Sequence, residues 1–329
     1  MNSVLDLQNQ IKGFALSCQT EGKSPKTIEW YTCFLQRLLQ FLQLYNYPTD
    51  VGEIDKTHIR FFIIYLQQQA KTPHTDKPLS SATVQGYIRT LKVFFSWLLR
   101  EEYIESNPMT KIPVPRAPVK VINTFNHEHI EKLSTLCQTS NGSGYRNLTI
   151  ILLLLDSGIR VNELVNIDIN DLDLTEGYIK IRIAKGNRER LVPVGSIVQK
   201  SLWKYLNQYR SQPLTRKVTA LFLGEHGLPL TKSGVQQMLR RSGRTAGVTG
   251  VRCSPHTFRH TFAKNYLLNG GDIFSLQKIL GHSSLASVRI YLNLFAADLK
   301  EQHQRFSPVD NLTQIRSIYS HVRSIQHTL

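Results

Sequence analysis

The sequence predicts a mainly helical protein of two domains, the second of which also carries a small antiparallel sheet. Three observations support this prediction. Apolar residues recur at helical spacing through most of the chain, alternation with a period of two is confined to one short region, and a proline-rich stretch divides the two parts. A length of 329 residues with 41% hydrophobic side chains is sufficient for about two globular domains.

The first hundred residues have the pattern of four helices with recognisable start signals. The first helix is expected near residues 4–19. The second begins after Ser24, which is an N-cap residue followed by proline at the first helical position. Asp55 is the expected N-cap of the third helix, and Ser80 or Ser81 that of the fourth. These signals predict a compact, all-helical N-terminal domain.

A proline-rich segment follows these helices. Prolines at positions 108, 113, 115 and 118 remove backbone donors and hold the chain extended, so this segment is expected to be a linker. The expected organisation is an N-terminal domain at 1–106, a linker at 107–122, a second domain at 123–306 and a tail at 307–329.

The second domain combines helical patterns with one pair of strands. Residues 177–184 alternate with a period of two, and residues 189–194 look like the return strand of a hairpin whose turn is 185–188. Helices are expected on both sides of this hairpin, near residues 126–138, 145–157, 196–210, 231–246, 255–269, 272–280 and 284–294.

The positive charge of the chain is large and unevenly distributed. Forty lysines and arginines against 24 acidic residues give a formal charge of +16. Residues 1–115 hold 12 bases and 10 acids, which leaves 28 bases and 14 acids, an excess of +14, for residues 116–329. Such an excess favours a polyanionic partner over a small metabolite.

Membrane, exported and disulfide-stabilised proteins are not favoured. The longest apolar runs, 61–66 and 149–155, fall far short of the roughly 20 residues needed to span a bilayer. The N-terminus lacks the basic start and apolar core of a signal peptide. The four cysteines lie far apart with no C-x-x-C pair, so reduced thiols in a cytoplasmic protein are expected.

The densest group of unusual polar residues lies at 254–263. On a helix, His256, Arg259 and His260 share one side, while two phenylalanines share another that can pack into a core. An arginine can bind an anionic oxygen while a neighbouring imidazole exchanges a proton. A solvated basic face explains the same spacing. A zinc site is less favoured, because the glutamate of H-E-x-x-H and a nearby third ligand are missing.

Two further groups of polar residues adjoin glycines. Arg160 follows an apolar helix and a glycine break, and Glu163 comes three residues later, which also suits a simple ion pair at a helix start. Gly281 looks like a helix-ending position, which would place His282 on a turn and Tyr291 on the next helix. By itself, a tyrosine on an amphipathic helix is most often a half-buried core residue.

The hairpin turn supplies a concentration of positive charge. Lys185 lies in the turn and is flanked by Arg182, Arg188 and Arg190. A charged edge that discourages aggregation of the sheet would explain these residues as well.

Together these groups resemble the active-site series of the tyrosine recombinases, the phage integrase and Xer-like family. Three strings resemble that family's boxes: Ser-Gly-Ile-Arg-Val-Asn-Glu-Leu at 157–164, His-Thr-Phe-Arg-His-Thr-Phe-Ala at 256–263, and Leu-Gly-His-Ser-Ser at 280–284 with Tyr291 nine residues after the histidine. The resemblance extends over the whole chain. It implies an N-terminal SAM-like core-binding domain and a C-terminal catalytic domain with the DNA breaking-rejoining fold.

The resemblance implies an enzyme that breaks and rejoins DNA without hydrolysis, cofactor or metal. It implies Tyr291 as the nucleophile, Arg160 and Arg259 as the clamp on the phosphate, Lys185 as the general acid, His256 as the proton-transfer partner of the tyrosine and His282 as a hydrogen-bond donor to the phosphate. Glu163 would orient its active-site neighbours, and His260 would give structural support.

The implied partners are double-stranded DNA with specific recombination sites and further protomers. A homotetramer would assemble on two sites, alone or with a related recombinase or accessory proteins, in the cytoplasm at the nucleoid. The candidate DNA contacts are Lys26, Arg89 and Lys92 in the first domain, and Arg182, Arg188 and Arg190 beside Lys185. For the first three, an ordinary solvated surface is an equally good explanation.

Two other functions remain open from the sequence. A type IB topoisomerase uses similar residues to swivel one duplex, and a non-catalytic DNA-binding protein could keep the same fold. The helical N-terminal domain and the two glycine-containing strings favour a recombinase, and no active-site position is missing. The 38 residues after Tyr291 suit either a contact with a neighbouring protomer or a disordered or self-packed tail.

Overall fold

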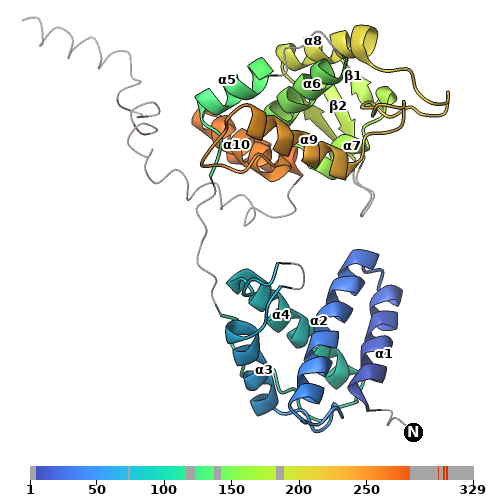
Figure 1. Ribbon diagram of the computed structural model, residues 1–329, viewed down its shortest axis with the longest axis vertical. Coiled ribbons are helices and arrows are strands. Elements are labelled where there is room, and N and C mark those ends of the chain that lie inside the picture. The colour runs from blue at the N-terminus through green and yellow to red at the C-terminus, as the bar shows by residue number, and fades with distance from the viewer. Residues whose placement is uncertain are drawn as a thin grey trace, which may run out of the picture. The chain divides into compact units, whose positions relative to one another are not determined.

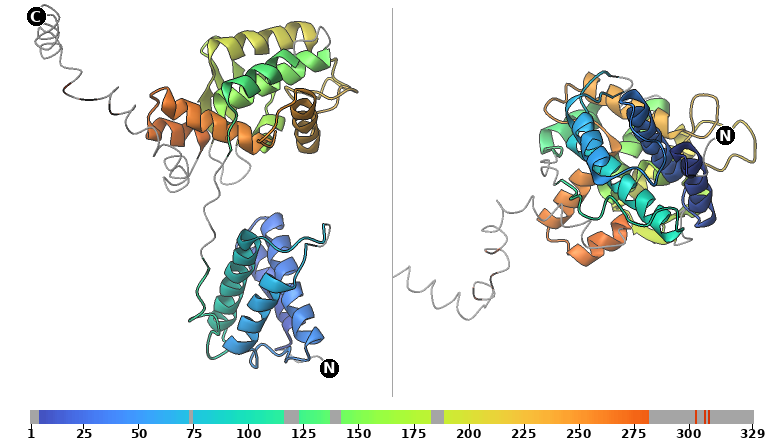
Figure 2. Two further views of the ribbon diagram at one scale, coloured as in Figure 1. Left: turned by 60° about the vertical axis from the view of Figure 1, so that its left-hand side comes forward. Right: turned by 90° about the horizontal axis from the view of Figure 1, so that it is seen from below.

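The computed structural model describes residues 5–72, 75–115, 123–136, 142–182 and 189–281, with residues 303, 307 and 309. The chain divides into two compact units, Met1–Lys120 and Val121–Leu329 (Figures 1 and 2). Within the described stretches, no helix is both long enough and apolar enough to cross a membrane.

The first unit contains the four expected helices. They are α1 (Leu7–Thr20), α2 (Pro25–Leu44), α3 (Lys56–Gln68) and α4 (Ser81–Arg100). Each begins where a short polar side chain accepts a backbone N–H of the first turn, from Asp6, Ser24, Asp55 and Ser80 respectively. These caps satisfy donors that the helix itself leaves unpaired, so the start signals in the sequence are confirmed.

Aromatic side chains contact one another in the core between these helices. The ring of Phe14 in α1 meets Phe94 in α4 edge to face at 5.4 Å, and Phe34 in α2 stacks on Tyr87 in α4 at 3.8 Å between ring centroids. Gly86 allows this close approach of α2 and α4, because a Cβ there would lie 3.1 Å from the Phe34 ring. The unit therefore has an apolar core of its own.

The second unit is also mainly helical. Its helices are α5 (His127–Leu136), α6 (Gly142–Ser157), α7 (Val161–Val165), α8 (Ser196–Lys204), α9 (Lys232–Thr245), α10 (Pro255–Leu268) and α11 (Ile273–Leu280). The helix expected near 196–210 ends earlier and continues as a π-helical turn, Tyr205–Tyr209. The helix expected near 284–294 lies outside the described residues.

A small antiparallel sheet accompanies these helices. Its strands β1 (Leu172–Asp173), β2 (Tyr178–Ile181) and β3 (Arg190–Pro193) are hydrogen-bonded in that order, and Ile181 lies opposite Arg190. The hairpin of β2 and β3 was expected. Strand β1 was not, because two residues are too few to show a period-two pattern. The turn residues 183–188 lie outside the described part of the chain.

Helix α6 lies at the centre of the second unit. It packs against α5, α8 and α10, and its residues Ile150, Ile151, Leu153 and Leu154 are fully buried (Figure 1). A helix that is apolar on most sides is suited to such a central position. The candidate active site begins where this helix ends, at Ser157.

Candidate active site

The turn after α6 brings Arg160 to the N-terminus of α7. Gly158 has a left-handed backbone with φ of +58°, and a Cβ there would lie 2.3 Å from Phe262 Cδ1 and 2.9 Å from Leu280 Cδ2. The turn is therefore packed directly against α10 and α11. Arg160 is the N-cap residue of α7, and 43% of its side chain remains exposed.

Arg259 reaches the same place from α10. Ser254 caps this helix and Pro255 is its first residue, so the helix begins where the pattern near 255–269 predicts. The side chain of Arg259 is buried, with 6% of the residue exposed, and it donates from Nη1 to the Gly158 carbonyl and from Nη2 to the Leu280 carbonyl, each at 2.7 Å. The solvated basic face that the spacing left open is thus wrong for Arg259.

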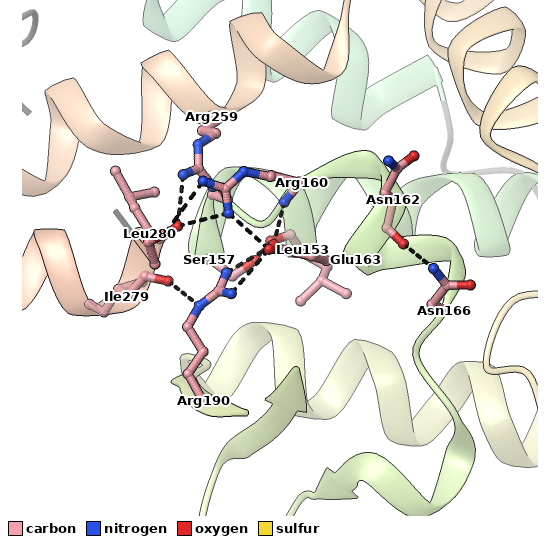
Figure 3. A network of polar contacts seen from close by, with 12 residues as sticks. Leu153, Ser157, Arg160, Asn162, Glu163, Asn166, Arg190, Arg259, Ile279 and Leu280 are labelled. Atoms are coloured by element: carbon pink, nitrogen blue, oxygen red, sulfur yellow. Dashed lines mark hydrogen bonds and ion pairs between the residues drawn. The ribbon is translucent and has the colours of Figure 1, made fainter. Parts of the chain in front are cut away.

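The carboxyl end of α11 holds the two arginines together. The Leu280 carbonyl also accepts from Arg160 Nη1 at 3.3 Å, and the Gly281 carbonyl accepts from Arg160 Nη2 at 3.5 Å (Figure 3). The last carbonyls of a helix carry a partial negative charge, which offsets the repulsion between two guanidinium groups. Gly281 ends α11 with φ of +63°, so its expected helix-ending role is confirmed.

Glu163 holds Arg160 from the other side. Its Oε2 accepts the backbone N–H of Arg160 at 2.8 Å, and its Oε1 accepts from Arg160 Nη1 at 3.0 Å. Arg190 of β3 donates to the same two oxygens, from Nη1 to Oε1 at 3.0 Å and from Nη2 to Oε2 at 2.8 Å. Figure 3 shows both arginines converging on this one carboxylate.

The surroundings of Glu163 keep it ionised. Burial by itself would raise the pKa of this carboxyl group, whose side chain is only 9% exposed. The hydrogen bonds from Arg190, from the Arg160 backbone and from the Arg160 side chain outweigh burial and hold the pKa below its ordinary value. A charged carboxylate is therefore a permanent part of the site at neutral pH.

Two histidines lie one helical turn apart on α10. His256 is exposed near the start of the helix, and His260 is half-buried. Burial lowers the pKa of His260, and the nearby charges of His256 and Arg259 lower it further. His260 is consequently neutral at neutral pH, which suits a supporting role better than proton exchange.

The described residues thus bring together three of the expected site residues, Arg160, Glu163 and Arg259. Both histidines lie on the helix that carries Arg259. The other expected site residues Lys185, Arg188, His282 and Tyr291 lie outside the described residues. Within the described stretches, no cluster of three or more His, Cys, Asp or Glu side chains is arranged to hold a metal.

Arg190, one of the expected DNA contacts, is largely buried in the structure. Only 11% of its side chain is exposed, and its Nε donates to the Ile279 carbonyl at 2.9 Å in addition to the two bonds to Glu163. The sequence contained a signal for this inward position. Arg190 alternates in phase with Val192 and Val194, which are both buried.

The remaining candidate DNA contacts lie at the surface. Arg182 is exposed and pairs at 2.6 Å with the carboxylate of the buried Asp171. In the first unit Lys26 and Arg89 are exposed and Lys92 is half-buried, and Lys26 pairs with a glutamate one turn away. Their contact with DNA stays a prediction.

The geometry is suited to binding an anion. Arg259 is fixed by two carbonyls, Arg160 is fixed by carbonyls and by Glu163, and 43% of the Arg160 side chain is exposed. Guanidinium groups held in advance can stabilise negative charge on phosphate oxygens without reorganising first.

Known proteins share both units of this chain. The phage integrase family matches residues 123–297, and the N-terminal SAM-like domain of phage integrases matches residues 11–105. The tyrosine recombinase XerD of Staphylococcus haemolyticus is 32% identical over 289 residues, which cover 88% of this chain and 94% of that protein. The XerD of Listeria monocytogenes is 30% identical over 289 residues, with 87% and 94% covered.

A solved structure has the same architecture. The crystal structure of XerA recombinase is 28% identical to this chain, covers 92% of it and 99% of the XerA chain, and superimposes with a TM-score of 0.51. Because both domains match in order and the relatives align over nearly their whole length, the chain belongs to the phage integrase family, the tyrosine-type site-specific recombinases.

Proposed function

We propose that this recombinase cuts and rejoins duplex DNA at specific sites by transesterification through a tyrosine. The observation that carries the proposal is the meeting of Arg160 and Arg259 on the Leu280 carbonyl, two residues before His282 in the sequence. Two guanidinium groups held close together, one buried and one partly exposed, can stabilise the charge of a phosphodiester when its phosphorus becomes five-coordinate.

In the first step the hydroxyl of Tyr291 attacks the scissile phosphorus. A bond forms between the tyrosine oxygen and phosphorus, the bond to the 5′ oxygen breaks, and a 3′-phosphotyrosine and a free 5′-hydroxyl result. His256 assists removal of the tyrosine proton, and Lys185 gives a proton to the leaving oxygen. Arg160 and Arg259 neutralise the non-bridging oxygens, with a hydrogen bond from His282.

In the second step the 5′-hydroxyl of a partner strand attacks the phosphotyrosine. This reverses the first step, restores the tyrosine and joins the strands in a new order. Because the energy of the phosphodiester is kept in the covalent intermediate, neither water nor a nucleotide cofactor is consumed. Two duplexes, each cut at two positions, require four protomers, so the proposal includes a homotetramer on DNA at the nucleoid.

A nicked suicide substrate tests this function. The short fragment that carries the freed 5′-hydroxyl diffuses away after cleavage, so the wild-type protein should accumulate a protein–DNA adduct that resists SDS. Tyr291→Phe should abolish the adduct and leave DNA binding within about twofold, because only one hydroxyl is lost. Adducts that persist in Tyr291→Phe would show that another residue is the nucleophile.

Products on two-site plasmids separate recombination from relaxation. The proposed function predicts recombinant circles or inverted segments. Relaxed plasmid without any recombinant product would instead indicate an enzyme of the type IB topoisomerase kind. DNA binding without any adduct would indicate a protein that has kept the fold but not the chemistry.

A further inference from the structure

Arg190 makes contacts at the active site that a role in binding DNA does not explain. We propose that Arg190 is a positioning residue which occupies the Glu163 carboxylate, so that Arg160 is held in place and keeps its positive charge for the phosphate. This inference rests on the proposed function. It assigns to β3 a part in organising the active site, although Arg190 itself would not touch DNA.

The geometry of the carboxylate is the first support. Each oxygen of Glu163 accepts one hydrogen bond from Arg160 and one from Arg190, at distances between 2.8 and 3.0 Å. The Arg190 guanidinium binds both oxygens side by side, which fixes the plane of the carboxylate (Figure 3). That fixed plane then determines where the Arg160 side chain can lie.

The balance of charge is the second support. A single carboxylate facing Arg160 alone would form a neutral pair and weaken the attraction of Arg160 for a phosphate. With Arg190 on the same carboxylate, the three groups together carry one net positive charge. Arg190 and Glu163 are 11% and 9% exposed but Arg160 is 43% exposed, so the net charge is presented on the accessible side.

The fit around Arg190 is the third support. Its Nε binds the Ile279 carbonyl at 2.9 Å, which connects β3 to the carboxyl end of α11. A Cβ on Gly281 would lie 2.9 Å from Arg190 Nη1 and 3.0 Å from its Cζ. Gly281, which precedes His282 in the sequence, therefore packs directly against the Arg190 guanidinium. A larger residue at this position would overlap with that guanidinium.

The experiment compares four variants with the wild type. Arg190→Met removes the charge and keeps the length, whereas Arg190→Lys keeps the charge and loses the fork. The double variant Arg190→Met/Glu163→Gln also removes the carboxylate charge. Lys180→Met is the matched control, since it removes a positive charge from the same hairpin, where Lys180 pairs with Glu189 at the surface.

Three quantities are measured for each variant. They are the single-turnover rate of adduct formation on the nicked substrate, the Kd for uncut DNA, and the Tm. Arg190→Met should form the adduct about 100-fold more slowly, because Arg160 would lose its fixed position and with it the stabilisation of the transition state, with Kd changed by less than about threefold. Arg190→Lys should be about 10-fold slower, and Lys180→Met should cleave at the wild-type rate within about twofold.

The double variant separates a charge role from a merely structural one. Because Glu163→Gln removes the carboxylate that would neutralise Arg160, the double variant should cleave about 5- to 10-fold faster than Arg190→Met. Loss of packing alone predicts that the second substitution slows cleavage further. Equal or slower cleavage by the double variant would therefore overturn the proposal.

Other outcomes are equally decisive. If Arg190→Met does not fold, Arg190→Lys carries the test, and a wild-type cleavage rate in that variant would overturn the proposal. If Lys180→Met and Arg190→Met slowed adduct formation equally, the effect would come from the general charge of the hairpin. That result would also overturn the proposal. Failure of the wild type to form any adduct would instead refute the proposed function, and with it this role of Arg190.

Discussion

Arg160 and Arg259 carry the same guanidinium group in very different surroundings. Arg259 is buried and donates hydrogen bonds to the carbonyls of Gly158 and Leu280, whereas 43% of the Arg160 side chain is exposed. A buried donor must be paired, because leaving it without a partner costs about 1–3 kcal/mol. Arg259 is therefore expected to support the fold of the second unit as well as the proposed chemistry.

Replacing Arg259 by lysine tests this double role. A lysine cannot bind two carbonyls on separate segments with a fixed fork, so one carbonyl loses its donor. We expect the free energy of unfolding to fall by about 1–3 kcal/mol in urea titrations, together with a large loss of adduct formation. The exposed Arg216→Lys is the control and should unfold within about 0.5 kcal/mol of the wild type. Equal stability of the two variants would contradict the role in the fold.

His260 is expected to make the stability of the protein depend on pH, because its pKa is lowered in the folded state. The pKa of the folded side chain is lowered by burial and by the charges of His256 and Arg259, while the unfolded chain keeps the ordinary value. Stability from this residue is complete above that ordinary value. As the pH falls through it, the unfolded chain takes up a proton first and stability is lost.

His260→Gln should remove this dependence. The wild type is expected to lose more free energy of unfolding between pH 7.5 and pH 5.5 than the variant does, in parallel urea titrations. Because other groups titrate equally in both proteins, only the difference between the two curves is attributed to His260. Parallel curves would show that His260 does not resist protonation in the folded state.

At the level of secondary-structure elements, the turn between α6 and α7 is closely packed against its neighbours. Gly158 and Gly250 both have a left-handed backbone, with φ of +58° and +73°. A Cβ on Gly158 would collide with Phe262 and Leu280, but on Gly250 it would meet nothing within 4 Å. Comparing substitutions at the two glycines therefore distinguishes the cost of backbone strain from the cost of steric overlap.

Alanine substitutions at the two glycines measure this difference. Gly250→Ala should lose about 1–2 kcal/mol of unfolding free energy from the left-handed backbone alone. Gly158→Ala should lose about 2–4 kcal/mol, because overpacking of α10 and α11 adds to the same strain. If urea titrations showed that the two variants lose the same free energy of unfolding, α10 and α11 would have moved aside to accommodate the new methyl group at little energetic cost.

In the hairpin of β2 and β3, a period of two along the sequence indicates which side chains point inward. Arg182 follows the buried Ile181 and is exposed, whereas Arg190 stands in phase with the buried Val192 and faces inward. The prediction that both arginines contact DNA considers their charge but not their phase along the strand. The alternation of the sequence is enough to distinguish the inward arginine from the outward one.

For the whole molecule, the uneven charge predicts a strong dependence of DNA binding on salt. Residues 116–329 carry an excess of +14, and residues 1–115 only +2. A protein with six or more phosphate contacts loses about 1,000-fold or more in affinity between 50 and 200 mM salt. We expect the Kd of the full chain for duplex DNA to rise by that factor over this range of salt.

Fluorescence anisotropy over a salt series measures this dependence. The slope of log Kd against log salt should be steep for specific and unrelated duplexes alike, since the phosphate backbone is common to both. A Kd that hardly changes over the series would show that the excess charge is not used on DNA. Such a result would leave the proposed cleavage chemistry to be judged by the adduct alone.

The sequence by itself determined the elements and the residues of the boxes. Helix starts at Ser24 and Asp55, the helix end at Gly281 and the hairpin of β2 and β3 follow from caps, glycines and periodicity, which are local properties of the chain. The sequence did not predict strand β1, because two residues are too few to show an alternating pattern.

Only the tertiary structure decided which partner each charged side chain binds. Arg190 binds Glu163 across 27 positions of the sequence, and Arg259 binds the Gly158 carbonyl across 101 positions. No local pattern encodes partners so far apart, because burial and packing of whole elements bring them together. Packing of α6, α10, α11 and β3 thus placed Arg190, which the sequence offered as a DNA contact, against Glu163.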